Sequence, residues 1–187
     1  CPLTQIDHDY WYHHSPTDPD NSWGPEFNYE KYDEHLDVKP AWKYVGDNVN
    51  FWIREYHIDG IRYDATKQID NYDFFHWIVN QTREHAGMKP FINIAEHIPE
   101  DPSISSPDGP MDSAWHYSFY ANILEHICGD RYEPEELKSV LDCKRHDFIG
   151  STSVVNYLSN HDQNRVMVEL GDRGIVGEAA FKRVKLG

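Results

Sequence analysis

Three short apolar runs, each followed by an acidic residue, most constrain what this chain can fold into. They occupy residues 58–64, 91–96 and 153–159, and the third is followed directly by Asn160, His161 and Asp162. Each run is too short for a helix, and stretches with helical periodicity separate them. This alternation predicts an α/β fold in which buried parallel strands are covered by helices. A weaker fourth strand is predicted at residues 114–118.

The stretches between the runs carry apolar residues at helical spacing. Helices are expected from Pro40 to residue 56, over residues 72–86 and 119–127, from Pro134 onward, and over residues 177–186. Residues 1–36 are expected to be mostly irregular, and residues 65–69 and 99–109 are expected to be loops. A closed βα barrel needs eight strands and about 250 residues. Four strands therefore indicate either an open sheet or part of a barrel.

The overall charge excludes two classes of partner. The 187 residues carry 17 Lys and Arg against 32 Asp and Glu, a formal charge of −15. Such a field repels nucleic acid and anionic membranes, so neither is expected as a partner. Three cysteines without a C-x-x-C pair favour reduced thiols in a reducing, cytoplasmic compartment. No apolar stretch approaches the length of a membrane span.

The end of the first run combines an arginine with an aspartate. Arg62 and Asp64 are two residues apart, so in a strand both side chains lie on one face. A carboxylate at the carboxyl end of a barrel strand is typical of a catalytic residue, and a neighbouring guanidinium favours its ionised, nucleophilic form. A purely structural Asp–Arg pair is the alternative on these residues alone.

Asp64, Glu96 and Asp162 all follow apolar runs, and the carboxyl ends of parallel strands meet at one mouth of a barrel. Retaining glycoside hydrolysis requires a carboxylate nucleophile and a carboxylic acid that donates a proton, about 5 Å apart. Asp64 beside Arg62 suits the nucleophile, and Glu96, which has no adjacent cation, suits the acid. Asp162 would stabilise the sugar in the transition state, with His161 as a hydrogen-bond donor. An unrelated acid-rich open-sheet protein is an alternative.

The polar, aromatic amino-terminal segment offers no defensible metal site. His8, Asp9, His13 and His14 match no zinc spacing. The acids that begin at Asp18 resemble the start of a calcium loop, but the required glycine is replaced by tryptophan. Neither a metal nor a cofactor is expected. We interpret this segment as a loop that lines a cleft.

Taken together, the motifs resemble the alpha-amylase family of glycoside hydrolases, glycoside hydrolase family thirteen. Residues 59–65 (DGIRYDA), 94–96 (IAE) and 159–162 (SNHD) are similar, in order and spacing, to the second, third and fourth signature regions of that family. The resemblance implies a (β/α)8 barrel, α-1,4-glucan substrates and a double-displacement mechanism that retains the α configuration. It implies Asp64 as nucleophile, Glu96 as acid/base and Asp162 as transition-state stabiliser.

The chain departs from the family at its amino-terminal side. The first signature region and the first three strands are absent, so the resemblance implies a partial TIM barrel of about strands 4–7 with their helices. Residues 1–187 would then be the C-terminal portion of a catalytic barrel. Residues 1–36 would supply an active-site loop region, and residues 37–187 the βα units.

Within the family, residues 23–29 (WGPEFNY) are most similar to glycogen branching enzymes and related trehalose-releasing hydrolases. We therefore expect a branching transglycosylase that acts on glycogen-like α-1,4-glucan. An amylase-type or trehalose-releasing hydrolase is the alternative, and an inactive amylase-like scaffold is the alternative of another class. The expected substrate-binding residues are Arg62, His161, Asn160, Lys67 and Trp23.

Overall fold

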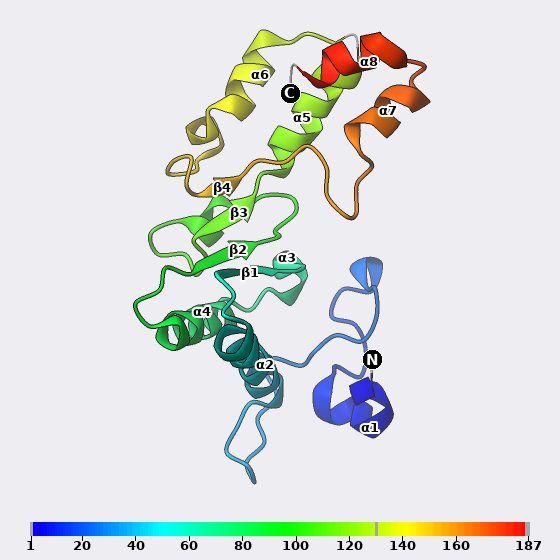
Figure 1. Ribbon diagram of the computed structural model, residues 1–187. Helices are drawn as coiled ribbons and strands as arrows, with labels where there is room; N and C mark the ends of the chain where they lie inside the picture. The colour runs from blue at the N-terminus through cyan, green and yellow to red at the C-terminus, as the bar shows by residue number, and fades with distance from the viewer. Residues whose placement is uncertain (1, 130, 186–187) are drawn as a thin grey trace. The chain divides into compact units, whose positions relative to one another are not determined.

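The computed structural model describes residues 2–129 and 131–185, and Figure 1 shows their course. The elements, in chain order, are α1 Pro2–Trp11, η1 Pro19–Asn21, α2 Pro40–Tyr56, β1 Gly60–Tyr63, α3 Thr66–Ile69, α4 Tyr72–Ala86, β2 Ile92–Ala95, η2 Pro102–Ser105, β3 Ser113–Trp115, α5 Tyr117–Cys128, α6 Pro134–Leu141, η3 Cys143–His146, β4 Val154–Val155, α7 Val166–Asp172 and α8 Gly177–Val184. The chain divides into two compact units, residues 1–93 and 94–187.

The first unit is built on α2 and α4, which pack side by side (Figure 1). Pro40 begins α2, where a missing amide hydrogen costs nothing, and His57 ends it in a left-handed conformation. Asn71 caps α4 by accepting a hydrogen bond from Phe74 N at 2.8 Å. Both helices are confirmed, and α4 buries the face predicted from its periodicity. The predicted core face of α2 is only partly buried, because Trp52 and Tyr56 are exposed. Their buried residues are Ala41, Val49, Ile53, Phe74, Phe75, Ile78, Val79 and Thr82.

Strand β1 lies against the start of β2 within the same unit. Ile92 N donates to Asp59 O at 3.1 Å. A Cβ atom on Gly60 would lie 2.6 Å from Ile92 O, closer than real Cβ contacts, so this position requires glycine. Asn93, the one polar residue of β2, is buried and accepts hydrogen bonds from Tyr63 Oη and Thr82 Oγ1, both at 3.1 Å.

The second unit carries a parallel sheet with helices beyond it. The end of β2 pairs with β3, and β3 pairs with β4, in both cases in parallel. Ala114 stands at the centre of this register, opposite Ala95 on one side and Val154 on the other. The predicted α/β fold with a parallel sheet is confirmed. The partial barrel, its missing strands and the assignment of residues 1–36 and 37–187 stay predictions.

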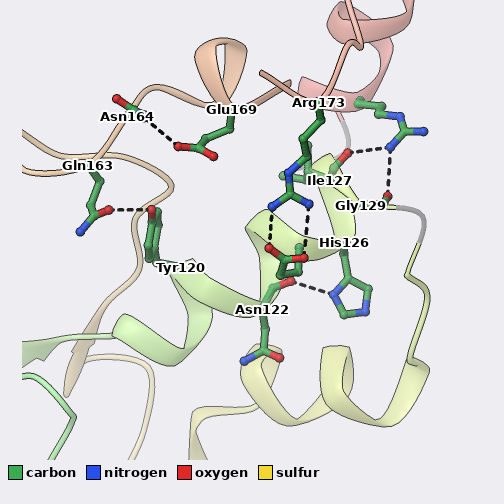
Figure 2. A network of polar contacts seen from close by, with 11 residues as sticks. Tyr120, Asn122, His126, Ile127, Gly129, Gln163, Asn164, Glu169 and Arg173 are labelled. Carbon is green, nitrogen blue, oxygen red and sulfur yellow. Dashed lines mark hydrogen bonds and ion pairs between the residues drawn. The ribbon is translucent and has the colours of Figure 1, made fainter. Parts of the chain in front are cut away.

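Helix α5 forms the centre of the second unit, between α6 on one side and α7 and α8 on the other (Figure 1). Burial of each large apolar side chain in such a core stabilises the fold by about 1.5–3 kcal/mol. Polar contacts connect the carboxyl-terminal part of α5 to α7 and α8. Arg173 Nη2 lies 2.6 Å from Glu125 Oε1, and Arg183 Nη1 donates to Ile127 O at 3.2 Å (Figure 2). The core residues are Tyr120, Ile123, Leu124, Ile127, Cys128, Val140, Val166, Leu170 and Ala180.

Several sequence predictions are wrong in detail. The segment 1–36 is mostly irregular, as predicted, but it contains two helical elements that were not predicted: α1, in two helical parts separated by a non-helical Asp7, and η1. Helix α1 buries no residue, so its sequence lacks the apolar face by which a helix is recognised. Short helical turns, α3 and η2, also interrupt the loops expected at 65–69 and 99–109.

The strand boundaries differ as well. The run 153–159 forms a strand only at Val154–Val155. At the next residue, the side chain of Asn156 meets that of His116, with Asn156 Oδ1 2.8 Å from His116 Nδ1. The strand expected at 114–118 is Ser113–Trp115, and α5 starts at Tyr117. Helix α7 was not predicted from the sequence. The last helix ends at Val184, and residue 186 lies outside the described residues.

Cys128 and Cys143 are buried free thiols, whereas Cys1 lies outside the described residues. Among the helices of the described chain, none combines the length and the apolar character that crossing a membrane requires.

A chain of hydrogen bonds connects the carboxyl end of β3 to α6. His116 is fully buried, and both of its ring nitrogens have partners. Its Nδ1 meets Asn156, and its Nε2 lies 3.3 Å from His146 Nδ1. His146 Nε2 in turn lies 2.9 Å from Ser139 Oγ. Burial lowers the pKa of His116 below 6.5; the bond to Asn156 and the charge of Glu100 oppose this shift, and His146 adds to it.

We predict that this histidine makes the protein less stable in acid. Because the folded-state pKa of His116 lies below its ordinary value, the unfolded chain binds more protons below pH 6.5, and the free energy of unfolding falls as the pH falls. Thermal unfolding measured from pH 7.5 to 5 should show a smaller loss of stability in His116→Gln than in the unaltered protein. His76→Gln, at an exposed histidine, is the control. Equal pH slopes for the protein and His116→Gln would contradict this assignment.

Candidate active site

Asp64 is placed by the end of β1 and by a turn immediately after it. Arg62 Nη1 forms an ion pair with Asp64 Oδ1; the Asp64 side chain is 75% exposed and that of Arg62 is 23% exposed. The next residue, Ala65, has φ 49° and ψ 41°, a left-handed conformation that costs a non-glycine residue about 1–2 kcal/mol. This turn ends the strand at the carboxylate and starts α3. The expected proximity of Arg62 and Asp64 is thus observed.

A cavity of about 540 Å³ adjoins Asp64 within the first unit. This volume is in the range of small-molecule sites. Asp64, Ala65, Gln68 and Ile69 line one part of it, and residues between Thr17 and Tyr29 line the rest. The cavity therefore joins a carboxylate to a wall of aromatic and polar side chains.

Trp23 belongs to the same cavity as Asp64, although its side chain is 75% exposed. Tyr29, another lining residue, is anchored by its main chain, which accepts a hydrogen bond from Trp42 Nε1 at 2.9 Å. Burial raises the pKa of Tyr29 well above 10, so this phenol stays neutral. Flat aromatic faces beside a carboxylate suit a sugar ring. Lys67 is exposed on α3 and, among the described residues, is not one that lines this cavity.

The segment that carries Trp23 is closed by Glu26. Thr17 donates to the Glu26 carboxylate from both its main-chain N, at 2.9 Å, and its Oγ1, at 2.6 Å. His13 N donates to Glu26 O at 2.8 Å. These bonds turn residues 13–26 into a closed loop. Its sequence signal was only the polar, aromatic composition.

In the second unit, Glu96 follows β2 directly and is half-buried. Its negative charge contributes to raising the pKa of Tyr157, a shift that is caused chiefly by burial. Tyr157 stacks on Tyr120, with ring centroids 5.2 Å apart and planes inclined by 8°, and it also contacts Trp115.

The segment Asn160–Asp162 is held by its own hydrogen bonds and by those of the residues that follow. Asp162 N donates to Asn160 Oδ1 at 2.9 Å, and His161 Nε2 lies 3.1 Å from Asp162 Oδ2. Just beyond, Tyr120 Oη donates to Gln163 Oε1 at 3.0 Å, as Figure 2 shows. Gln163 and Tyr120 were not predicted as site residues from the sequence, because neither belongs to a strand-end acid motif.

The structure thus brings Arg62 and Trp23 to Asp64 in the first unit, and gathers Asn160, His161 and Asp162 in the second. That Asp64, Glu96 and Asp162 meet around one sugar stays a prediction, and so do the roles of the substrate-binding residues. Among the described residues, no three His, Cys, Asp or Glu side chains form a group able to hold a metal ion.

We predict that Glu26→Ala opens the loop that carries Trp23. Two hydrogen bonds to the Glu26 carboxylate are lost, each worth about 1 kcal/mol, so the open form should become about 30-fold more populated. Limited proteolysis with chymotrypsin, followed by mass spectrometry, should show faster cleavage at Trp23. Glu34→Ala, at an exposed acid in a neighbouring loop, should cleave as the unaltered protein does. Equal cleavage in Glu26→Ala would show that other contacts hold the loop.

No protein-family profile matches the chain. The chain is 25% identical over 172 residues to Alpha-amylase 2 of Schwanniomyces occidentalis, which covers 79% of this chain and 32% of that protein. It is 30% identical over 113 residues to malto-oligosyltrehalose trehalohydrolase of Saccharolobus solfataricus, which covers 58% of this chain and 19% of that protein.

Among solved structures, an alpha-amylase from Anoxybacillus superposes on 98% of this chain with a TM-score of 0.75 and 20% identity. The superposed part is 41% of that structure, so the chain spans well under half the length of each of these three proteins. The weak sequence similarity and the structural superposition both point to proteins of the alpha-amylase type. The chain therefore has the α/β fold, with a parallel sheet, of alpha-amylase-family proteins.

Proposed function

We propose that these residues form part of the catalytic barrel of a retaining enzyme that acts on α-1,4-glucans. The observation that carries the proposal is the position of the acids in a chain with an alpha-amylase-type fold: Asp64 directly follows β1, Glu96 directly follows β2, and Asp162 lies in the loop after β4. Carboxyl groups at the ends of parallel strands are the arrangement that glycoside cleavage in a barrel requires.

In the proposed mechanism, Asp64 attacks the anomeric carbon while Glu96 protonates the departing glycosidic oxygen. The glycosyl unit becomes covalently bound to the Asp64 carboxylate, and the leaving chain departs with the proton from Glu96. Glu96 then removes a proton from the acceptor, whose oxygen displaces Asp64 and restores the α configuration. Asp162 and His161 stabilise the sugar during charge development. The ion pair with Arg62 supports this mechanism, since it orients the Asp64 carboxylate.

The acceptor decides which of two activities results. A glucan hydroxyl as acceptor gives branching, the activity favoured by residues 23–29, part of which line the cavity beside Asp64. Water as acceptor gives hydrolysis. This second candidate is favoured by the relatives, which are named as an amylase and a trehalohydrolase. Asn160, Lys67 and Trp23 are proposed to contact the glucan in either case.

We predict that Asp64→Asn, in the protein that contains these residues, lowers turnover of amylose by more than about a thousandfold while glucan binding persists, because an amide cannot form the glycosyl ester. Turnover and binding are measured separately, by product analysis and by affinity electrophoresis. Asp73→Asn, at an exposed acid in the first turn of α4, should leave turnover within about twofold. Full activity in Asp64→Asn would refute the proposed nucleophile.

The products of amylose separate the two activities. A branching enzyme should lower iodine staining and create α-1,6 linkages with little gain in reducing ends, since each bond cleaved is replaced by another. A hydrolase should release reducing ends that appear first as the α anomer, which ¹H NMR detects within the first turnovers. Release of the β anomer would contradict a retaining mechanism in either case.

A further inference from the structure

The first unit contains another cavity, of about 510 Å³, that shares no lining residue with the cavity beside Asp64. It lies between α2, α4 and the segment that precedes α2. Its volume is in the range of small-molecule sites. None of the acids at the strand ends lines this cavity, and the proposed mechanism does not use it.

Two tryptophans supply the indole rings of this second cavity. Trp42, from α2, and Trp77, from α4, have ring centroids 5.3 Å apart with planes inclined by 41°. The Trp42 indole is fixed by its hydrogen bond to Tyr29 O. Opposite Trp77, a Cβ atom on Gly46 would lie 2.6 Å from Trp77 Cη2, so glycine provides the space that this ring occupies. The indoles are therefore held in place at the cavity wall.

The charges around the second cavity are compensated. Lys43 Nζ pairs with Asp47 Oδ2 at 2.7 Å, and Tyr32 Oη bonds with Asp37. Lys39 Nζ lies 4.2 Å from the Trp42 ring centroid. Apart from His85, the charged side chains of the lining are two lysines and two aspartates, a balance that argues against an anionic ligand such as a nucleotide. It favours a neutral ligand that combines an apolar face with hydrogen-bonding groups.

Two carboxamides add neutral polar groups to the same wall, those of Asn50 and Gln81. Asn50 Oδ1 is buried and accepts no hydrogen bond from the residues that the structure describes. A buried acceptor without a donor is unfavourable. If the Asn50 amide changes its orientation toward the cavity, a ligand hydroxyl can donate a hydrogen bond to Oδ1. Hydroxyl groups combined with flat apolar faces are the surface of a sugar.

We propose that this second cavity binds a neutral oligosaccharide, an α-1,4-linked glucan, at a site apart from the catalytic acids. Trp42 and Trp77 stack against sugar faces, and Asn50 and Gln81 pair with hydroxyl groups. The saccharide class follows from the cavity itself. The choice of an α-glucan rests on the proposed function. Such a site would hold a long glucan on the enzyme while another part of the chain reacts.

Hydroxyl-radical footprinting with maltoheptaose tests the proposal directly, because it reports each tryptophan separately. Saccharide should reduce oxidation of Trp42 and Trp77 at least twofold. Trp52, on the same helix as Trp42, is 44% exposed and is not one of the residues lining the cavity, so its oxidation should not change. Unchanged oxidation of Trp77 at saturating maltoheptaose would overturn the proposal.

Matched variants separate this cavity from the active site. Trp77→Ala should weaken retention in an amylose affinity gel about tenfold, whereas Trp52→Ala should stay within twofold of the unaltered protein. Gly46→Ala, a helix-favouring change that places a methyl group against Trp77, should also weaken retention. Retention equal to that of Trp52→Ala in both cavity variants would overturn the proposal.

Asp64→Asn distinguishes failure of this inference from failure of the proposed function. In that variant, maltoheptaose should still protect Trp77 although turnover is lost. Protection lost together with turnover would show that the tryptophans respond to the active site, and the second site would be refuted. Turnover retained in Asp64→Asn would refute the proposed nucleophile, whereas protection of Trp77 would still report on the cavity.

Discussion

The buried carboxamide of Asn93 is the constraint on which the first unit depends. Its Oδ1 accepts hydrogen bonds from Tyr63 on β1 and Thr82 on α4, and an unsatisfied acceptor at this depth would cost about 1–3 kcal/mol. The two hydrogen bonds connect β2 to its neighbour β1 and to the covering helix α4. With Tyr63 buried, side-chain alternation puts Arg62 and Asp64 on the other face of β1. Glu96 then follows the last residue of β2.

Strand ends supply the candidate chemistry because charged groups have no place inside the sheet. Ala95 is fully buried, whereas Glu96 is only half-buried and Asp64 is mostly exposed. The left-handed Ala65 stores about 1–2 kcal/mol of backbone strain immediately after the acid. Strain of this kind persists where surrounding contacts over-determine the conformation, and such positions cluster at functional sites. The ion pair with Arg62 is one such contact.

The two cavities described in the first unit both have aromatic walls, but these walls are held in place in different ways. The sequence is rich in tryptophan and tyrosine, and these residues gather at both cavities. Beside Asp64, the aromatic wall comes from a loop closed by Glu26, so its shape depends on a few hydrogen bonds. In the second cavity the indoles stand on two packed helices, and their positions are set by core packing.

The sequence by itself determined the elements whose signals are local. Apolar periodicity and end residues predicted α2 and α4, and the short apolar runs predicted the strands. Arg62 and Asp64 were predictable partners because they are two residues apart in a strand. Only the tertiary structure decided that α1 forms without a buried face, that β4 stops where Asn156 meets His116, and that Trp23 lies in the same cavity as Asp64. These features depend on contacts between residues far apart in the chain, and no local pattern encodes such contacts.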